Sequence, residues 1–213
     1  MMLVTRPDYD PATRYLSAWS SILMEEAERR KLRVIDLPGE KARKADLVGR
    51  INKLKPDLLV LNGHGSDECI AGQDAEVLVK AKDNAVLLKG KVTYAVSCNS
   101  AAVLGEEVGT YSDTAYIGFE NEFAIIQSQD HASRPLDDPF AKPFMEFSNQ
   151  VVTGLLKGHK TAECVSRAKE TGKAKINALL TSDSDPDKQA IARYLWWDIQ
   201  GLVCKGDQNK KIL

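Results

Sequence analysis

The sequence predicts an α/β fold with a mainly parallel sheet, because short apolar segments alternate with longer amphipathic ones along the chain. Residues 58–61 are a continuous apolar run, which is typical of a strand buried on both faces. The 213 residues, 43% of them hydrophobic, suffice for a substantial core. We find no internal repeat and expect a single domain over residues 1–213.

The first half of the chain supplies most of the predicted strands. Residues 2–5 form the first, and Asp10-Pro11 then begins a helix, as a cap and first-turn pair. Apolar residues recur at helical spacing up to about residue 27 and again over residues 47–54, on either side of a second strand at 32–37. Residues 66–89 are less regular and favour a small hairpin.

The second half begins with two further strands, at residues 91–97 and 115–119, and the intervening residues 101–108 are predicted to be helical. Residues 127–139 are polar and contain proline, so we expect a loop there. Three helices follow, over about 140–155, 161–180 and from 185 onward, and residues 199–204 are predicted as the last of about six strands.

The charge balance excludes several functions. Lys and Arg total 29 and Asp and Glu total 30, so the chain has no global field to attract a polyanion, and we expect no nucleic-acid partner. No apolar run approaches the 18 residues of a membrane span. The first residues lack the basic and apolar regions of a secretory signal, so we expect a cytoplasmic protein that does not bind membranes.

The four cysteines are Cys69, Cys98, Cys164 and Cys204. They are too sparse for a disulfide framework, and with no paired Cys-x-x-Cys and only three histidines we expect no metal site. Three of them lie in apolar or helical surroundings and are interpreted as structural. Cys98 differs, because it follows a predicted strand.

His64 and Cys98 end neighbouring predicted strands. Ligands bind beyond the carboxyl ends of such strands, so both side chains are expected at a site. A thiol at the start of the helix predicted after Cys98 would have a lowered pKa, and His64 could serve as its base. The N–H groups of Gly65 and Cys98 could hold an oxyanion. From the residues alone, the pair is either a catalytic dyad or two unrelated packing residues.

Residues 64–74 resemble the caspase pattern around the catalytic histidine, in which His-Gly is followed at the same spacing by an aliphatic residue, a glycine and an acidic residue. Next comes an apolar strand that ends in a small residue and Cys98. This order of motifs is similar to that of caspase-like peptidases, and residues 97–105 most resemble the separase and CHAT-domain branch. The spacing from His64 to Cys98 is shorter than the roughly 50 residues of caspases. Val96 stands where metacaspases carry an acid.

The resemblance implies a three-layer α/β/α sandwich, with residues 127–139 between large-subunit-like and small-subunit-like portions. It implies a cysteine endopeptidase (thiol protease, a hydrolase) that acts on a protein substrate through a His64–Cys98 dyad, without a third member or a cofactor. Bacterial relatives serve in defence, including antiviral defence, and in regulated proteolysis, so a partner protein that activates or inhibits the enzyme is expected.

Specificity is expected from the residues after the fifth strand, which line the pocket for the P1 residue in separases and CHAT proteases. Glu120 and Glu122 there would favour Arg or Lys through charge-assisted hydrogen bonds, and Asp67 is a further candidate. The alternative is that these are solvated loop charges. Trp196 and Trp197 are interpreted as core packing.

Two other functions stay open. One is a catalytically silent caspase-like module that binds a partner. The other is an unrelated cysteine hydrolase or amidotransferase, although Val96 and Ser100 occupy the glycine positions of its nucleophile elbow. Proline follows both Arg134 and Lys142, so we expect the chain to work without cleavage at these bonds.

Overall fold

A six-stranded sheet runs through the centre of the molecule in the order β2-β1-β3-β6-β7-β8. The computed structural model describes residues 1–181 and 185–212. Its first five strands are parallel, and β8 is antiparallel to β7. The strands are β1 (Met2–Arg6), β2 (Val34–Pro38), β3 (Leu58–Asn62), β6 (Val92–Val96), β7 (Ala115–Phe119) and β8 (Leu202–Gly206). The predicted, mainly parallel sheet is confirmed.

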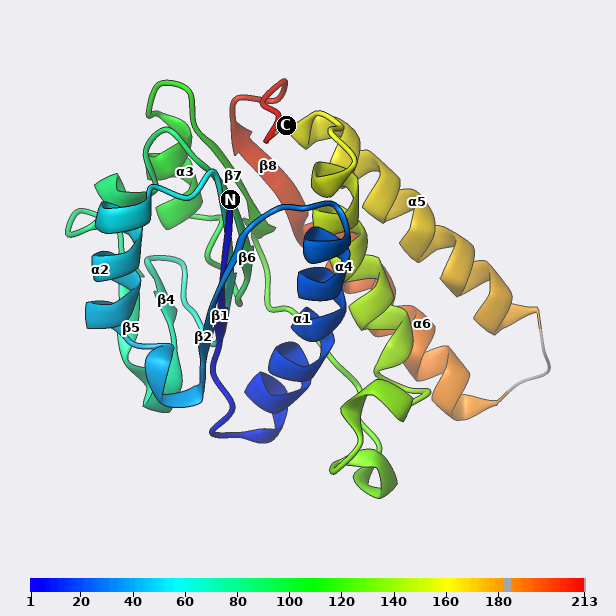
Figure 1. The fold of residues 1–213 in the computed structure, drawn as a ribbon. Helices are drawn as coiled ribbons and strands as arrows, with labels where there is room; N and C mark the ends of the chain where they lie inside the picture. Colours follow the sequence, from blue (N-terminus) through cyan, green and yellow to red (C-terminus); the bar gives the residue numbers. More distant parts are fainter. Residues whose placement is uncertain (182–184, 213) are drawn as a thin grey trace.

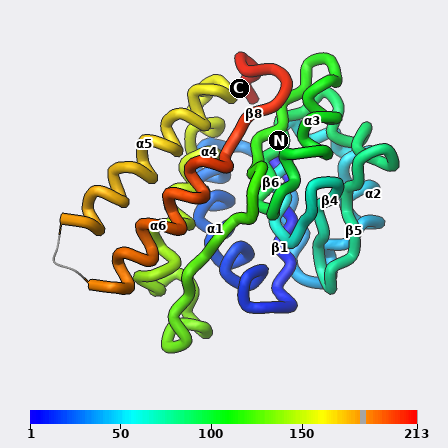
Figure 2. The backbone as a smooth tube through the Cα atoms, turned by 180° about the vertical axis from the view of Figure 1, so that it is seen from behind, coloured from blue at the N-terminus to red at the C-terminus, as the bar shows by residue number. Residues whose placement is uncertain are grey.

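Helices cover both faces of the sheet and make three layers (Figure 1). One face carries α1 (Pro11–Arg29), α4 (Lys142–Leu156), α5 (Thr161–Leu180) and α6 (Pro186–Gly201). The other carries α2 (Lys44–Leu54), α3 (Leu104–Gly109) and the predicted hairpin, β4 (Cys69–Ala71) with β5 (Val77–Lys80). The short 3-10 helices are η1 (Gly39–Lys41), η2 (Gln73–Ala75), η3 (Ala85–Leu88), η4 (Gln129–His131) and η5 (Pro135–Asp137). Seen from behind, the hairpin and α2 lie on one side and α5 and α6 on the other (Figure 2).

The core divides into two parts, one on each face of the sheet. Leu58 and Val60 of β3 pack toward α1 and α4, whereas Leu59 and Leu61 pack toward α2 and the hairpin. Successive side chains of a strand point to opposite faces, so a strand covered on both faces needs an uninterrupted apolar run. Within the described residues, no helix is long and apolar enough to cross a membrane.

Two element boundaries differ from the prediction. The helix expected at residues 101–108 begins at Leu104, because Asn99 and Ala101 donate their N–H groups to the loop and strand end near Phe119 rather than continuing a helix. The strand expected at residues 199–204 begins at Leu202, and Ile199 lies on the buried face of α6. Apolar residues suit either a buried helix face or a buried strand, so their pattern did not separate the two.

The parallel strands end together at one edge of the sheet, the lower edge in Figure 1, where α1 begins. The segments after β3, β6 and β7 meet there. This edge holds His64 and Cys98, as the strand order predicts.

Candidate active site

His64 directly follows β3 and stands between two glycines. A Cβ on Gly63 would lie 1.9 Å from the carbonyl oxygen of Ala71, and Gly63 has a φ of +149°. A Cβ on Gly65 would lie 2.0 Å from Oγ of Ser97 and 2.9 Å from the carbonyl oxygen of Cys98. Larger residues at either position would collide with neighbouring atoms, so Gly63 lets the His64 turn approach the hairpin at Ala71, and Gly65 lets it approach the turn of Ser97 and Cys98.

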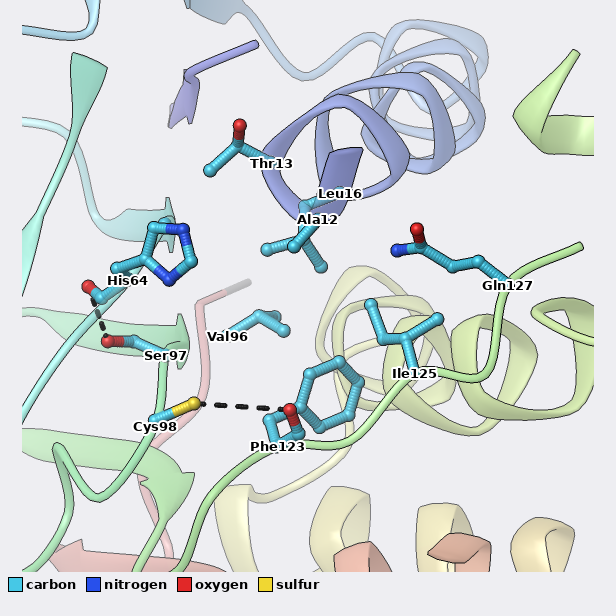
Figure 3. Close-up of a pocket in the computed structure, with 11 residues that line it drawn as sticks. Ala12, Thr13, Leu16, His64, Val96, Ser97, Cys98, Phe123, Ile125 and Gln127 are labelled. Atoms are coloured by element: carbon cyan, nitrogen blue, oxygen red, sulfur yellow. Dashed lines mark hydrogen bonds between the residues drawn. The ribbon is translucent and has the colours of Figure 1, made fainter. Parts of the chain in front are cut away.

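Cys98 lies in a turn after β6 rather than at the start of a helix. Its Sγ is 3.9 Å from the carbonyl oxygen of Phe123 (Figure 3). The expected lowering of its pKa is wrong: burial raises the pKa of the thiol, and the negative charges of Glu122 and Asp198 add to the increase, against a hydrogen bond from the Phe123 backbone. The physical reason is that α3 begins only at Leu104, so no helix end stabilises the thiolate.

His64 and Cys98 line the same pocket, of about 220 Å³, and face it from neighbouring strand ends (Figure 3). Its remaining lining is mostly apolar and comes from α1, the end of β6 and the segment after β7: Ala12, Thr13, Leu16, Gly63, Val96, Ser97, Phe123, Ile125 and Gln127. Among the described residues, no hydrogen bond joins the histidine ring to the thiol. The two groups are brought together at one cavity without direct contact.

Asp10 holds the His64 ring instead. Its Oδ2 lies 2.5 Å from Nε2 of His64, while its Oδ1 accepts the N–H of Thr13 at 2.8 Å and so caps α1. Burial raises the pKa of Asp10, but the hydrogen bonds from Thr13 and His64 outweigh burial and hold the pKa below its usual value. A carboxylate therefore orients the ring and can stabilise its protonated form.

We named no partner for the His64 ring from the sequence, and the structure adds Asp10 as one. Asp10 lies 54 positions before His64 in the sequence. Its position at the N-cap of α1 already accounted for an aspartate there, so nothing in the sequence suggested a further contact. The sequence carries no signal for the second role, since only the packing of α1 beside β3 brings the carboxylate to the ring.

Two backbone donors are available beside the thiol. Gly65 forms an isolated antiparallel bridge with Ile70, in which His64 and Ser66 make the flanking hydrogen bonds. Within the described part of the chain, the N–H groups of Gly65 and Cys98 donate no hydrogen bond to another residue. These are the two donors that the sequence suggested for an oxyanion hole, and both are unoccupied by the protein's own acceptors.

The three acidic residues expected in a specificity pocket lie in three different environments. Glu120 pairs with Lys205 of β8 at 2.5 Å, and the carbonyl oxygen of Asp67 accepts the N–H groups of Val103 and Leu104. Neither residue belongs to the lining of the two cavities described here that Cys98 borders. The antiparallel pairing of β8 with β7 places Lys205 near Glu120. The backbone of Asp67 contacts the first residues of α3.

Glu122 does line a cavity that reaches Cys98. This groove, of about 620 Å³, lies between the segment after β7 and α6; its lining is Cys98, Asn121, Glu122, Phe123, Ala124, Arg193, Tyr194, Trp196, Trp197 and Gln200. Trp196 and Trp197 are each 50% exposed, so the prediction that both are core residues is wrong. Trp197 instead donates its indole N–H to the carbonyl oxygen of Glu122 at 2.9 Å and fixes one wall of the groove.

The other cysteines have environments that suit packing. Burial raises the pKa of Cys164 to about 12 and that of Cys204 to about 11, so both stay protonated at neutral pH. Cys69 approaches Ser66 Oγ at 3.4 Å. All four cysteines are free thiols, and no group of three or more potential metal ligands occurs among the residues the structure describes.

No protein-family model matches the sequence, and a search of curated proteins gives no significant match.

Proposed function

We propose that this chain is a caspase-like cysteine endopeptidase of the CHAT-like type, with Cys98 as nucleophile and His64 as acid and base. One observation carries the proposal: two neighbouring parallel strands deliver a histidine and a cysteine to the walls of one pocket. The Asp10 carboxylate on the ring and the free N–H groups of Gly65 and Cys98 support it.

The proposed reaction proceeds by acyl transfer. His64 takes the thiol proton while Sγ of Cys98 bonds to the carbonyl carbon, and the resulting oxyanion accepts the N–H groups of Gly65 and Cys98. The C–N bond then breaks, and His64 returns the proton to the leaving amine. Water attacks the thioester, gives a proton to His64, and releases the acid as the proton returns to Cys98. Asp10 stabilises the imidazolium that forms twice in this sequence.

Two features support regulation of this activity. Burial raises the pKa of Cys98, and its thiol has no hydrogen bond to His64, so the resting site holds a neutral thiol. Binding of substrate or of a partner protein would bring ring and thiol together. A cytoplasmic setting, which keeps the four free thiols reduced, and a role in defence or regulated proteolysis belong to the same proposal.

Of the carboxylates from which a basic P1 residue was expected, Glu122 lines a groove beside Cys98, whereas Glu120 pairs with Lys205. If Glu122 contacts a basic residue of the substrate, Glu122→Gln lowers turnover of substrates with Arg or Lys at that position and leaves others unchanged.

The second candidate is a catalytically silent module that binds a partner protein. The raised pKa of Cys98 and the missing contact with His64 favour it, because a pseudoenzyme needs no activated thiol. Covalent labelling of Cys98 by a substrate-like probe distinguishes the peptidase from the silent module.

The test uses fluorogenic peptides and peptidyl chloromethyl ketones with Arg, Lys, Asp or Leu at P1. Wild type, Cys98→Ala, His64→Ala and the control Cys204→Ala on β8 are compared. We expect turnover and labelling of Cys98 in wild type and in the control, and loss of turnover in the other two variants. Turnover that survives Cys98→Ala would contradict the mechanism. A folded wild type that reacts with no probe would favour the silent module.

A further inference from the structure

The pocket between His64 and Cys98 has an apolar interior. Its lining includes the hydrocarbon side chains of Ala12, Leu16, Val96, Phe123 and Ile125, which lie to one side of the ring and the thiol, across the space that both groups face (Figure 3). No Asp, Glu, Lys or Arg belongs to the lining within the described residues. The chemistry of this pocket therefore differs from that of the groove beside it, which contains Glu122 and Arg193.

Most polar groups of the pocket are already hydrogen-bonded inside the protein. The Thr13 hydroxyl donates to Asp10, and the Ser97 hydroxyl donates to the carbonyl oxygen of His64 at 2.9 Å. Gln127 is the lining side chain whose amide has no partner among the described residues, and it lies on the segment after β7, across the pocket from His64 in Figure 3. A ligand in the pocket meets carbon surface and one amide.

A charged side chain of either sign would be poorly held here. A Lys or Arg would lose water without gaining a free carboxylate, because the nearest one, Asp10, is engaged by Thr13 and His64. An Asp or Glu would meet no Lys or Arg in the lining, and the His64 ring is already engaged by the negative charge of Asp10. Apolar side chains gain from burial at about 25 cal/mol per Å² of buried surface.

The sizes of the two cavities assign them to different parts of a substrate. The pocket of about 220 Å³ is smaller than the roughly 300–1,000 Å³ of sites for drug-sized ligands, so it suits one side chain. The groove of about 620 Å³ has room for several residues and runs along α6. P1 is the substrate residue whose carbonyl carbon Cys98 attacks, so its side chain enters the small pocket that Cys98 and His64 border.

We propose that the pocket between His64 and Cys98 selects an uncharged, apolar P1 residue of the size of leucine or methionine, and that the Glu122 groove receives residues further from the cleaved bond. This specificity rests on the proposed peptidase function. It differs from the basic P1 residue expected from Glu120 and Glu122, because the carboxylates lie outside the pocket.

The experiment profiles P1 with tetrapeptide chloromethyl ketones that differ only at that position and carry Leu, Met, Phe, Arg, Lys or Asp. Labelling of Cys98 is followed by intact mass. The test variant is Ile125→Asp, which places a carboxylate in the pocket wall on a partly exposed segment. The matched control is Leu136→Asp, the same change at a residue that is 43% exposed and outside the pocket.

We expect Leu and Met probes to label wild type at least about 10-fold faster than Arg, Lys or Asp probes, within the range that a side-chain pocket supplies. Ile125→Asp should reverse the order of Leu and Arg, and Leu136→Asp should leave it unchanged. Faster labelling by Arg or Lys probes in wild type would overturn the apolar pocket and leave the peptidase standing. No labelling of folded wild type by any probe would overturn both.

Discussion

Replacement of Asp10 by Asn tests whether this carboxylate serves the site or only the helix. Asparagine is as good an N-cap as aspartate, so its side-chain oxygen can keep the bond from the Thr13 N–H, now 2.8 Å long. The amide NH₂ then faces Nε2 of His64, which is 2.5 Å from the present carboxylate. A donor there forces Nε2 to be the unprotonated nitrogen, so the variant selects the other tautomer of His64.

The expected loss follows from the bond that disappears. A hydrogen bond to a charged group contributes about 1.5–3 kcal/mol, and about 1.4 kcal/mol corresponds to a tenfold change in rate. We therefore expect Asp10→Asn to lower kcat/KM about 10- to 100-fold. Stability should change by only a few tenths of a kcal/mol, since the cap is kept, whereas Asp10→Ala should also lose about 1 kcal/mol of stability.

Peptide hydrolysis and thermal unfolding monitored by circular dichroism, measured on both variants, separate the two roles. Wild-type kcat/KM in Asp10→Asn would refute the positioning of His64 by Asp10. A Tm that falls as far in Asp10→Asn as in Asp10→Ala would refute the retention of the cap.

Three further predictions concern stability and processing. Burial raises the pKa of Asp198 to about 8, above its ordinary value of about 3.9, so the folded state holds this proton more tightly than the unfolded state. The free energy of unfolding should therefore fall as pH rises between these values, by at most about 6 kcal/mol. Asp198→Asn should flatten that dependence, which Tm measurements at pH 5 and pH 8 would reveal. Gly65→Ala should cost about 1–3 kcal/mol of stability and abolish labelling of Cys98, because its Cβ would collide with Ser97, whereas Gly49→Ala in α2 meets no atom within 4 Å and should not destabilise. Intact mass of an active preparation should show one full-length species, and a fragment ending at Arg134 or Lys142 would contradict this.

The shared location of His64 and Cys98 is the feature of the site that the sequence predicted best. Each follows a strand recognisable from its apolar run, and parallel strands end at one edge, so their shared location could be predicted before any contact was known. Gly63 and Gly65, which flank His64, lie against Ala71 and Ser97, and the sequence did not predict these contacts.

The surroundings of Glu120, Trp196 and Trp197 could not be predicted from the sequence, for one shared reason. The side toward which a loop residue points depends on its spatial neighbours, which the local sequence does not contain. Glu120 was expected in the cleft, but β8 returns antiparallel to β7 and brings Lys205 to it. We expected Trp196 and Trp197 in the core because they are apolar, but both lie on the side of α6 that lines the groove.

By itself, the sequence determined the fold class and the shared location of His64 and Cys98 at one edge of the sheet, because periodicity and strand ends are properties of neighbouring residues in the chain. Tertiary structure alone decided the environment of those residues. The packing of α1 beside β3 gave His64 its carboxylate partner, and the segment after β7 buried the thiol and raised its pKa. Electrostatic energies depend on distances and on burial between segments remote in sequence, and only the folded chain fixes both.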